Sequence, residues 1–224
     1  MDIAQHKARL RQYFDGVGFQ RWSAIYGDAA LSPVRRSIRQ GHAAMLAAAA
    51  SWLDGWAGCT ALDVGCGTGL FSLTLARRGL QVTAVDIAPQ MVEATRAAAT
   101  AAGLADRLTC TLADLEDLQG RYDLVVCFDV LIHYPEAAFA PLLRHLATLS
   151  ADRLLFTFAP LSPLLAALHR VGGMFPHSQR RTDIQMIPER LVLATLKASG
   201  MEVRRSRRVS SGFYHVTLVE AVRA

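Results

Sequence analysis

The stretch LDVGCGTGLF, residues 62–71, constrains the fold of this chain more than any other. Gly65, Gly67 and Gly69 alternate between a short apolar strand and the helix expected after it. Glycines at such a first crossover let the backbone approach a ligand closely. Asp86 ends the next expected strand, where a carboxylate can bind the two hydroxyls of a ribose. The pattern therefore predicts an α/β fold that holds an adenosine cofactor across the carboxyl ends of its strands.

Strand-like and helix-like patterns alternate from residue 60 onward. This rhythm predicts a Rossmann-like, mostly parallel sheet with helices on both faces. The seven expected strands are 60–64, 81–85, 108–112, 124–128, 154–158, 202–209 and 213–222. The helices expected between them are 70–78, 88–102, one that begins near Pro135, and 189–198.

The first part of the chain reads as helices and contains no strand pattern. We interpret residues 1–45 as a helical cap or lid, and residues 46–224 as the core. Within the cap, residues 18–28 are interpreted as an aromatic-rich connector between two helices. The segment at about 160–188 is longer than a simple connector and is interpreted as a substrate-binding insertion.

The amino-acid composition excludes few classes of binding partner. The formal net charge is +5, and Lys7 and Lys197 are the only lysines, so arginine carries nearly all the positive charge. This balance is compatible with an anionic small molecule, anionic lipid or nucleic acid, and equally with a solvated surface. The sequence contains no transmembrane run and no secretory signal, and its four cysteines lack metal-ligand spacing. We therefore expect a cytoplasmic protein with free thiols and no protein-bound catalytic metal.

The glycine loop distinguishes between cofactors. A dinucleotide fingerprint would place its third glycine at Leu70, whereas here the spacing is G-x-G-x-G. Asp63 precedes the loop, and its carboxylate suits an ammonium or a sulfonium better than a pyrophosphate. This combination resembles motif I of the class I methyltransferases that use S-adenosylmethionine. The resemblance implies that the following residues bind this cofactor: Asp63, Gly65, Cys66, Gly67, Gly69, Asp86, Ile87, Asp114, Leu115, with Asp114 near the adenine.

A narrower resemblance covers nearly the whole chain. It is carried by GFQRWSAIYGD, SIRQGHAAM, DVLIHYP, FAPLSPLL with a downstream GGMFP, and SSGFYHVTLVEAVR. These segments resemble the magnesium-protoporphyrin IX O-methyltransferase family of the chlorophyll and bacteriochlorophyll pathways. The resemblance implies methylation of one propionate of the magnesium porphyrin, which leaves S-adenosylhomocysteine. It also implies magnesium chelatase as the partner that delivers the substrate, with the magnesium carried by the substrate.

The segment FDVLIHYP, residues 128–135, places polar side chains where the fourth strand ends. The resemblance implies a catalytic role for His133, as a donor to the propionate or an axial contact to the porphyrin magnesium; the alternative is a structural histidine. Tyr26 is the second catalytic candidate, and the alternative is a lid-packing aromatic. Tyr134 is a substrate-binding candidate that could equally pack or cap the next helix. Asp129 could orient the methionyl amine or simply begin that helix.

Three arginines complete the candidate site. Arg39 resembles a basic residue that meets the cofactor carboxylate in related folds, and Arg180 and Arg181 are candidate clamps for the second propionate. For each of them, exposed surface charge is the alternative. The apolar run at 161–175 suits a wall for the macrocycle, a peripheral contact with a photosynthetic membrane, or a core helix.

Other functions compete with this one. An O-methyltransferase for another small acid or phenol, such as a quinone precursor, would share the glycine loop, but a phenol of pKa ~10 would require a general base. A non-catalytic porphyrin carrier is disfavoured by the complete loop and its acids. Nucleic acid is not expected as a substrate, because no N/D-P-P-Y/F motif follows the fourth strand and no basic arm is appended.

Overall fold

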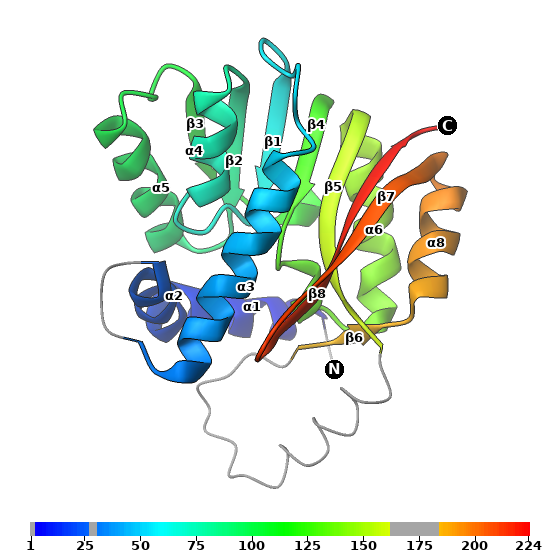
Figure 1. Cartoon of the computed structure of the whole chain (residues 1–224), viewed down its shortest axis with the longest axis horizontal. Helices are drawn as coiled ribbons and strands as arrows, with labels where there is room; N and C mark the ends of the chain where they lie inside the picture. The colour runs from blue at the N-terminus through cyan, green and yellow to red at the C-terminus, as the bar shows by residue number, and fades with distance from the viewer. Residues whose placement is uncertain (1–2, 27–30, 162–183) are drawn as a thin grey trace, which may run out of the picture.

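The computed structural model describes residues 3–26, 31–161 and 184–224. Its centre is an eight-stranded sheet in the order β3-β2-β1-β4-β5-β8-β7, with β6 paired to β5 (Figure 1). β1 to β5 are parallel, and β8 is antiparallel to both β5 and β7. The strands are β1 (Thr60–Val64), β2 (Gln81–Asp86), β3 (Leu108–Leu112), β4 (Tyr122–Cys127), β5 (Ser150–Pro160), β6 (Met186–Ile187), β7 (Met201–Ser211) and β8 (Tyr214–Arg223).

The prediction of a Rossmann-like, mostly parallel sheet is confirmed, but the predicted number of seven strands was one fewer than the described residues form. The missed strand is β6, which lies parallel to the end of β5 and pairs Met186 with Ala159 and Ile187 with Pro160. Two residues followed by Pro188 are too short to show an alternating pattern, so only the fold reveals them.

Helices cover both faces of the sheet and divide the interior into two apolar cores. One core contains residues of α6 (Glu136–Leu149) and α8 (Glu189–Ala198) together with Leu10 from α1. The other contains residues of α3 (Pro33–Ala50), α4 (Leu70–Arg77) and α5 (Pro89–Ala101). The buried parts of β4 and β5, residues 124–127 and 154–159, lie between these layers and read as mostly apolar runs, as expected for a parallel sheet covered on both faces.

The N-terminal region is more helical than predicted. Helix α1 (Ile3–Tyr13) passes through a π-helical turn, η1 (Phe14–Gly18), into α2 (Phe19–Tyr26), with a kink at Gly16. The interpretation of residues 18–28 as a connector was therefore wrong for most of its length. The spacing of Phe19, Trp22 and Ile25 places apolar side chains on one side of a helix, and this pattern was overlooked.

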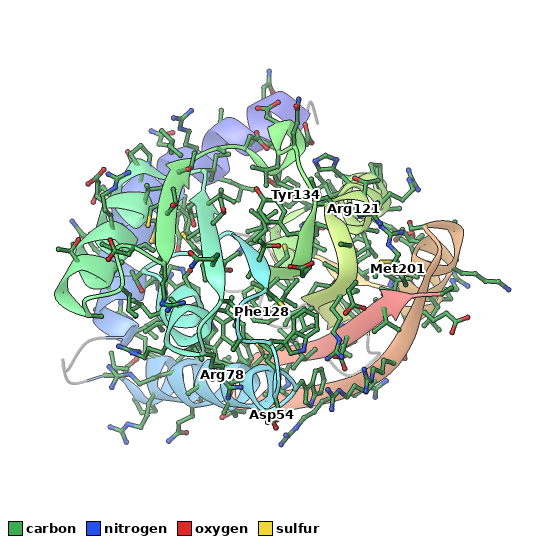
Figure 2. The ribbon with its side chains drawn as sticks, turned by 90° about the horizontal axis from the view of Figure 1, so that it is seen from above. Asp54, Arg78, Arg121, Phe128, Tyr134 and Met201 are labelled. Atoms are coloured by element: carbon green, nitrogen blue, oxygen red, sulfur yellow. The ribbon has the colours of Figure 1, made fainter. Side chains whose placement is uncertain are left out.

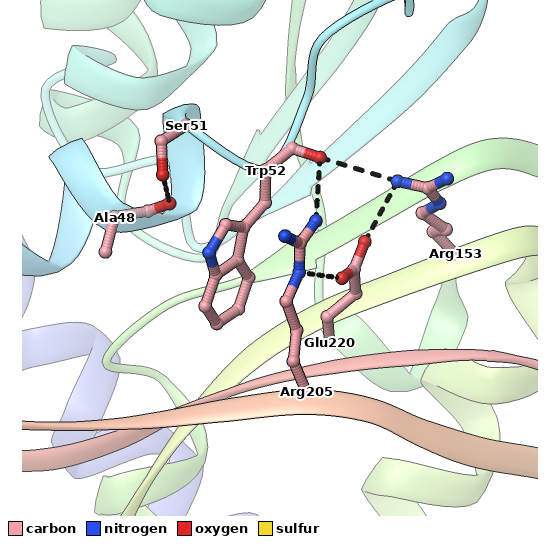
Figure 3. Close-up of polar contacts among 6 residues, drawn as sticks. All are labelled: Ala48, Ser51, Trp52, Arg153, Arg205 and Glu220. Carbon is pink, nitrogen blue, oxygen red and sulfur yellow. Dashed lines mark hydrogen bonds and ion pairs between the residues drawn. The ribbon is translucent and has the colours of Figure 1, made fainter.

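The last two strands are tied to the end of α3 by a buried ion-pair cluster (Figure 3). Glu220 on β8 is fully buried, and its two carboxylate oxygens accept hydrogen bonds from Arg153 (Nη1 to Oε1, 2.9 Å) and from Arg205 Nε. Both guanidinium groups also donate to the carbonyl of Trp52, at 3.4 and 3.3 Å. The cluster closes the end of the sheet opposite the glycine loop, and we call it the Glu220 cluster.

The predicted division into a cap at 1–45 and a core at 46–224 stays a prediction. Helix α3 continues to Ala50, five residues beyond the predicted boundary. Most of the predicted insertion at about 160–188 lies outside the described residues. Among the helices that the structure does describe, none combines the length and the apolar character needed to cross a membrane.

Candidate active site

A pocket with about 1100 Å³ of empty volume, partly open to solvent, lies at the carboxyl ends of β1, β2 and β4. This is where the strand order reverses between β1 and β4, the usual ligand position in open α/β sheets. Its described lining residues are Leu10, Phe14, Trp22, His42, Leu46, Asp63, Val64, Gly65, Cys66, Gly67, Thr68, Leu70, Phe71, Val85, Asp86, Ile87, Met91, Ala113, Leu115, Phe128, Asp129, Val130, His133 and Tyr134.

Two glycines of the loop, Gly65 and Gly67, have different roles at the pocket. Gly65 has a φ of +73°, and a Cβ at this position would lie 2.1 Å from Val130 Cγ2, so the loop after β4 packs directly on it. Gly67 also has a positive φ, +57°, but no described atom lies within 4 Å of its would-be Cβ. Gly65 is thus required by the protein's own packing, whereas Gly67 leaves space open toward the pocket.

Two buried carboxylates border this loop. Asp86 accepts hydrogen bonds from the backbone N–H groups of Gly67 (3.0 Å) and Ala88 (2.9 Å), and so connects the ends of β1 and β2. Asp63 accepts a hydrogen bond from the Ser72 hydroxyl. Burial raises the pKa of Asp63 to about 6 and also raises that of Asp86. Both groups would therefore be stabilised in their charged form by a cationic or hydrogen-bond-donating ligand.

These features fit S-adenosylmethionine. The open space at Gly67 admits close approach of a ligand, and the two acids can meet its hydroxyl, ammonium and sulfonium groups. The apolar side chains of Ile87, Met91 and Leu115 line the same pocket and suit a flat base. Burial raises the pKa of the Cys66 thiol well above its usual range, so this cysteine is a small neutral wall residue.

His133 also lines the pocket, at the end of the 3₁₀ turn η3 (Leu131–His133). It is buried, and its Nδ1 has no hydrogen-bond partner among the described residues. The Phe14 ring packs against it edge-on with centroids 5.3 Å apart, and His6 Nε2 lies 2.7 Å from the His133 carbonyl oxygen. Burial, with a smaller effect from His6, lowers the pKa of His133 to about 4, so the imidazole is neutral at pH 7.

Asp129 and Tyr134 line the pocket on either side of this turn. Asp129 has a φ of +57°, and its carboxylate accepts hydrogen bonds from the hydroxyls of Tyr214 and Thr157. Tyr134 is buried in the core that contains α6, whereas Phe128 belongs to the core on the α3 side; Figure 2 shows the two on opposite sides of the sheet. Burial raises the pKa of Tyr134, so its phenol stays protonated.

Several predicted residues lie outside the pocket lining. Asp114 binds Lys7 of α1 (2.7 Å) and caps the short turn η2 (Leu115–Asp117), while its neighbour Leu115 lines the pocket. Arg39 donates hydrogen bonds to the carbonyls of Ala24 and Ile25 near the end of α2. Gly69 forms the N-cap of α4 and lies close to Thr95.

Three predicted residues cannot be placed. Tyr26 is the last residue of α2, but its side chain lies outside the described structure, as do Arg180 and Arg181 entirely. In the described ranges no group of three or more His, Cys, Asp or Glu side chains could hold a metal ion.

The N-terminal helices supply lining residues that sequence reasoning missed. Leu10, Phe14 and Trp22 cover the pocket, and Lys7 and Asp15 fasten these helices by contacts to Asp114 and Gln90. His42 also lines the pocket from α3, a position for which no role was predicted from the sequence, and its Nε2 lies 3.8 Å from Asp129 Oδ2. The missed signal was its place in SIRQGHAAM, one of the segments that carried the narrower resemblance.

Comparison with known proteins identifies the family. Residues 127–223 match the model "Magnesium-protoporphyrin IX methyltransferase C-terminus", and residues 61–151 match "Methyltransferase domain". The magnesium-protoporphyrin O-methyltransferase of Synechocystis sp. PCC 6803 is 37% identical over 97% of this chain and 96% of its own length. The chain belongs to the magnesium-protoporphyrin IX methyltransferase family. The family member from Rhodobacter capsulatus is 34% identical over 95% of both chains.

Solved structures agree with this family assignment. The Synechocystis PCC 6803 magnesium protoporphyrin IX methyltransferase with bound S-adenosylhomocysteine superposes with a TM-score of 0.89 and 35% identity, over 97% of this chain and all of the other. A second structure of that protein, with bound S-adenosylmethionine, gives a TM-score of 0.85 and 32% identity, over 100% of this chain and 98% of the other. The narrower resemblance read from the sequence is therefore confirmed.

Proposed function

We propose that this protein transfers a methyl group from S-adenosylmethionine to one propionate carboxyl of magnesium protoporphyrin IX. The products are the monomethyl ester and S-adenosylhomocysteine, a step in chlorophyll or bacteriochlorophyll biosynthesis. The observation that carries the proposal is similarity, over nearly the whole chain, to enzymes named for this reaction. The pocket supports it, because the glycine loop and a buried neutral histidine both line it.

The proposed division of labour assigns the cofactor to the glycine-loop side. S-adenosylmethionine supplies an electrophilic methyl group on a sulfonium. Asp86 would hold the ribose hydroxyls, and Asp63 the cationic methionyl end. Gly67 would let the backbone approach, while Ile87 and Leu115 would pack on the adenine. The support for these roles is that all five residues line one continuous pocket.

The substrate needs alignment more than activation. A propionic acid titrates near pKa ~4–5, like a Glu side chain, so at neutral pH its carboxylate is already the nucleophile. The chain's residues would exclude water and align the carboxylate, and such positioning contributes roughly 7–11 kcal/mol in favourable cases. No general base is needed.

We infer that His133 is the group that meets the substrate. Its neutral ring and its Nδ1, which has no partner in the described part of the chain, suit a hydrogen bond to the propionate or an axial contact to the porphyrin magnesium. Tyr134 and Tyr26 are proposed to assist on the substrate side, and Arg180 and Arg181 to bind the second propionate. The porphyrin-binding subunit of magnesium chelatase is proposed as the delivery partner, because metal insertion must precede this methylation.

The test is incubation of the purified protein with magnesium protoporphyrin IX and S-adenosylmethionine, followed by mass spectrometry. We expect a single added methyl and one S-adenosylhomocysteine per porphyrin consumed. The matched control is the porphyrin with both propionates already esterified, which should give no product. Methylation of the esterified porphyrin, or no methylation of the free acid, would contradict the proposal.

A second candidate is methylation of a phenol on a quinone precursor. Ubiquinone biosynthesis O-methyltransferases from Xanthomonas are 36% identical over 125 residues, 53% of this chain. A phenol of pKa ~10 would need a base, and His133, with a pKa of about 4, is too weak to serve as one near neutral pH. A turnover rate that stays flat between pH 6.5 and 8 favours the carboxylate substrate; a rate that rises steeply favours the phenol.

A further inference from the structure

The structure assigns Tyr214 as a positioning residue: its hydroxyl holds Asp129, and through Asp129 it sets the loop that carries His133 and supports the glycine loop. This inference rests on the proposed function for its catalytic readout. It concerns a residue of the C-terminal hairpin, which stands outside the set of described residues that line the pocket.

The contacts at Asp129 define the cluster. Tyr214 donates its hydroxyl proton to the Asp129 carboxylate, with oxygen distances of 2.8 and 3.1 Å. Thr157 on β5 donates to Asp129 Oδ1 (3.0 Å) and accepts from the Asp129 backbone N–H (2.7 Å). Each carboxylate oxygen thus accepts a hydrogen bond from a protein hydroxyl, and these bonds fix the orientation of the Asp129 side chain.

The backbone at Asp129 explains why it must be held. Its φ of +57° makes it the only non-glycine residue with positive φ in the described part of the chain, a conformation that costs roughly 1–2 kcal/mol. Hydrogen bonds to both its carboxylate and its N–H offset that cost. Strained backbone of this kind persists only where surrounding structure determines it.

Two neighbours of Asp129 transmit its position to the site. Val130 follows directly and packs on the Cα of Gly65, so the loop after β4 forms a support for the glycine loop. The turn η3 begins at the next residue and ends at His133, whose N–H donates to the Val130 carbonyl at 3.0 Å. A shift at Asp129 would therefore displace the substrate side and the cofactor side together.

Tyr214 is itself held by close packing against α3. A Cβ at Gly41 would lie 2.5 to 2.8 Å from atoms of the Tyr214 side chain, so α3 can approach this ring only because residue 41 is glycine. His42, the next residue, packs edge-on against the same ring with centroids 6.2 Å apart. Helix α3 near the start of the chain and strand β8 at its end thus meet at the Asp129 carboxylate.

The test compares Tyr214→Phe with Tyr122→Phe, which removes a hydroxyl at the opposite end of the sheet. For Tyr214→Phe we expect kcat for porphyrin methylation to fall about tenfold, the effect of losing one hydrogen bond to a charged group. KM for the porphyrin should change less than threefold, and the melting temperature by only a few degrees. Tyr122→Phe should leave kcat unchanged. Gly41→Ala keeps the hydroxyl but displaces the ring, and should lower kcat in the same way.

A second measurement does not depend on porphyrin methylation. Amide hydrogen exchange of residues 128–134 in the cofactor-free protein should accelerate in Tyr214→Phe and not in Tyr122→Phe. If the wild type does not methylate the porphyrin but this exchange difference is present, the proposed function fails and the positioning role stands. Unchanged exchange, or unchanged kcat in an active enzyme, overturns the positioning role. A third result would also overturn the positioning role: Asp129→Asn weakens S-adenosylmethionine binding tenfold, while Tyr214→Phe alters neither kcat nor binding. Asp129 would then contact the cofactor directly.

Discussion

Buried charged and polar side chains have different kinds of partner at the two ends of the sheet. At the end beside Trp52, Glu220 has an arginine on each carboxylate oxygen, and Arg153 and Arg205 also stack on the rings of Trp56 and Trp52. At the carboxyl end, Asp63 is buried with the Ser72 hydroxyl, and His133 Nδ1 has no partner among the described residues. The protein itself supplies ion-pair partners for Glu220, whereas no ion pair among the described residues involves Asp63.

This difference separates residues that stabilise the fold from residues that await a ligand. A buried carboxylate with two guanidinium partners is stabilised by the protein alone, and breaking such a pair is costly. A buried polar atom without a partner carries a desolvation penalty that a ligand can relieve. We therefore expect changes at the Glu220 cluster to alter stability, and changes at the pocket to alter binding and turnover.

The largest effect is expected at the Glu220 cluster. Glu220→Gln removes the charge that both arginines neutralise, and should lower the free energy of unfolding by about 3 kcal/mol. Urea denaturation followed by circular dichroism measures this. The control is Glu202→Gln on the exposed side of β7, which should change stability by less than about 0.5 kcal/mol. Equal effects at the two positions would refute the contrast between the two ends.

Gly67→Ala should produce the largest effect on binding. Its methyl group would enter the open space beside Asp86, so affinity for S-adenosylmethionine should fall about a hundredfold, or roughly 2.7 kcal/mol. Gly55→Ala is the matched control, because Gly55 has a φ of +81° and similarly open surroundings but lies before β1, away from the pocket. Calorimetric titration should show weaker binding only in Gly67→Ala; equal loss in both variants would point to backbone strain instead.

Affinity for the cofactor should depend on pH through Asp63. Its folded-state pKa of about 6 lies above the usual value, so the carboxyl is protonated below that pH and must release a proton to meet a cation. The dissociation constant should therefore rise about tenfold per pH unit below about pH 6. Ser72→Ala removes a hydrogen bond that lowers this pKa, and should move the onset to higher pH. An affinity independent of pH from 5 to 7.5 would exclude Asp63 as the group that meets the cation.

The smallest effect on stability is expected at His133. His133→Phe replaces a buried ring whose Nδ1 lacks a described partner, so the free energy of unfolding at pH 7 should change by no more than about 1 kcal/mol. The folded pKa of His133 is depressed, so its contribution is present above about pH 6.5 and is lost as pH falls toward 4. The variant should therefore gain stability relative to the wild type across that window, while methyl transfer falls sharply. Unchanged turnover would remove His133 from the substrate site.

Much of the core could be predicted from the sequence because its signals are local. The glycine loop, the acids near the ends of β1 and β2, and the helix at 189–198 each depend on residues adjacent in the chain. The apolar runs of β4 and β5 similarly predicted strands buried on both faces. By contrast, α2 was missed because its short apolar pattern was read as a connector, and β6 because two residues carry no periodicity.

The sequence by itself determined the fold class and the residues of the glycine loop, since these follow from motifs and their spacing, and its segments already resembled the family that the comparisons show. Only the tertiary structure decided which acids face the pocket, and it placed the Asp114 carboxylate on Lys7 and Asp129 between Tyr214 and Thr157. It also brought His42, from the N-terminal helices, beside Asp129. The physical reason is that a side chain's partner is set by long-range packing, and Tyr214 and Asp129 are 85 residues apart in the chain.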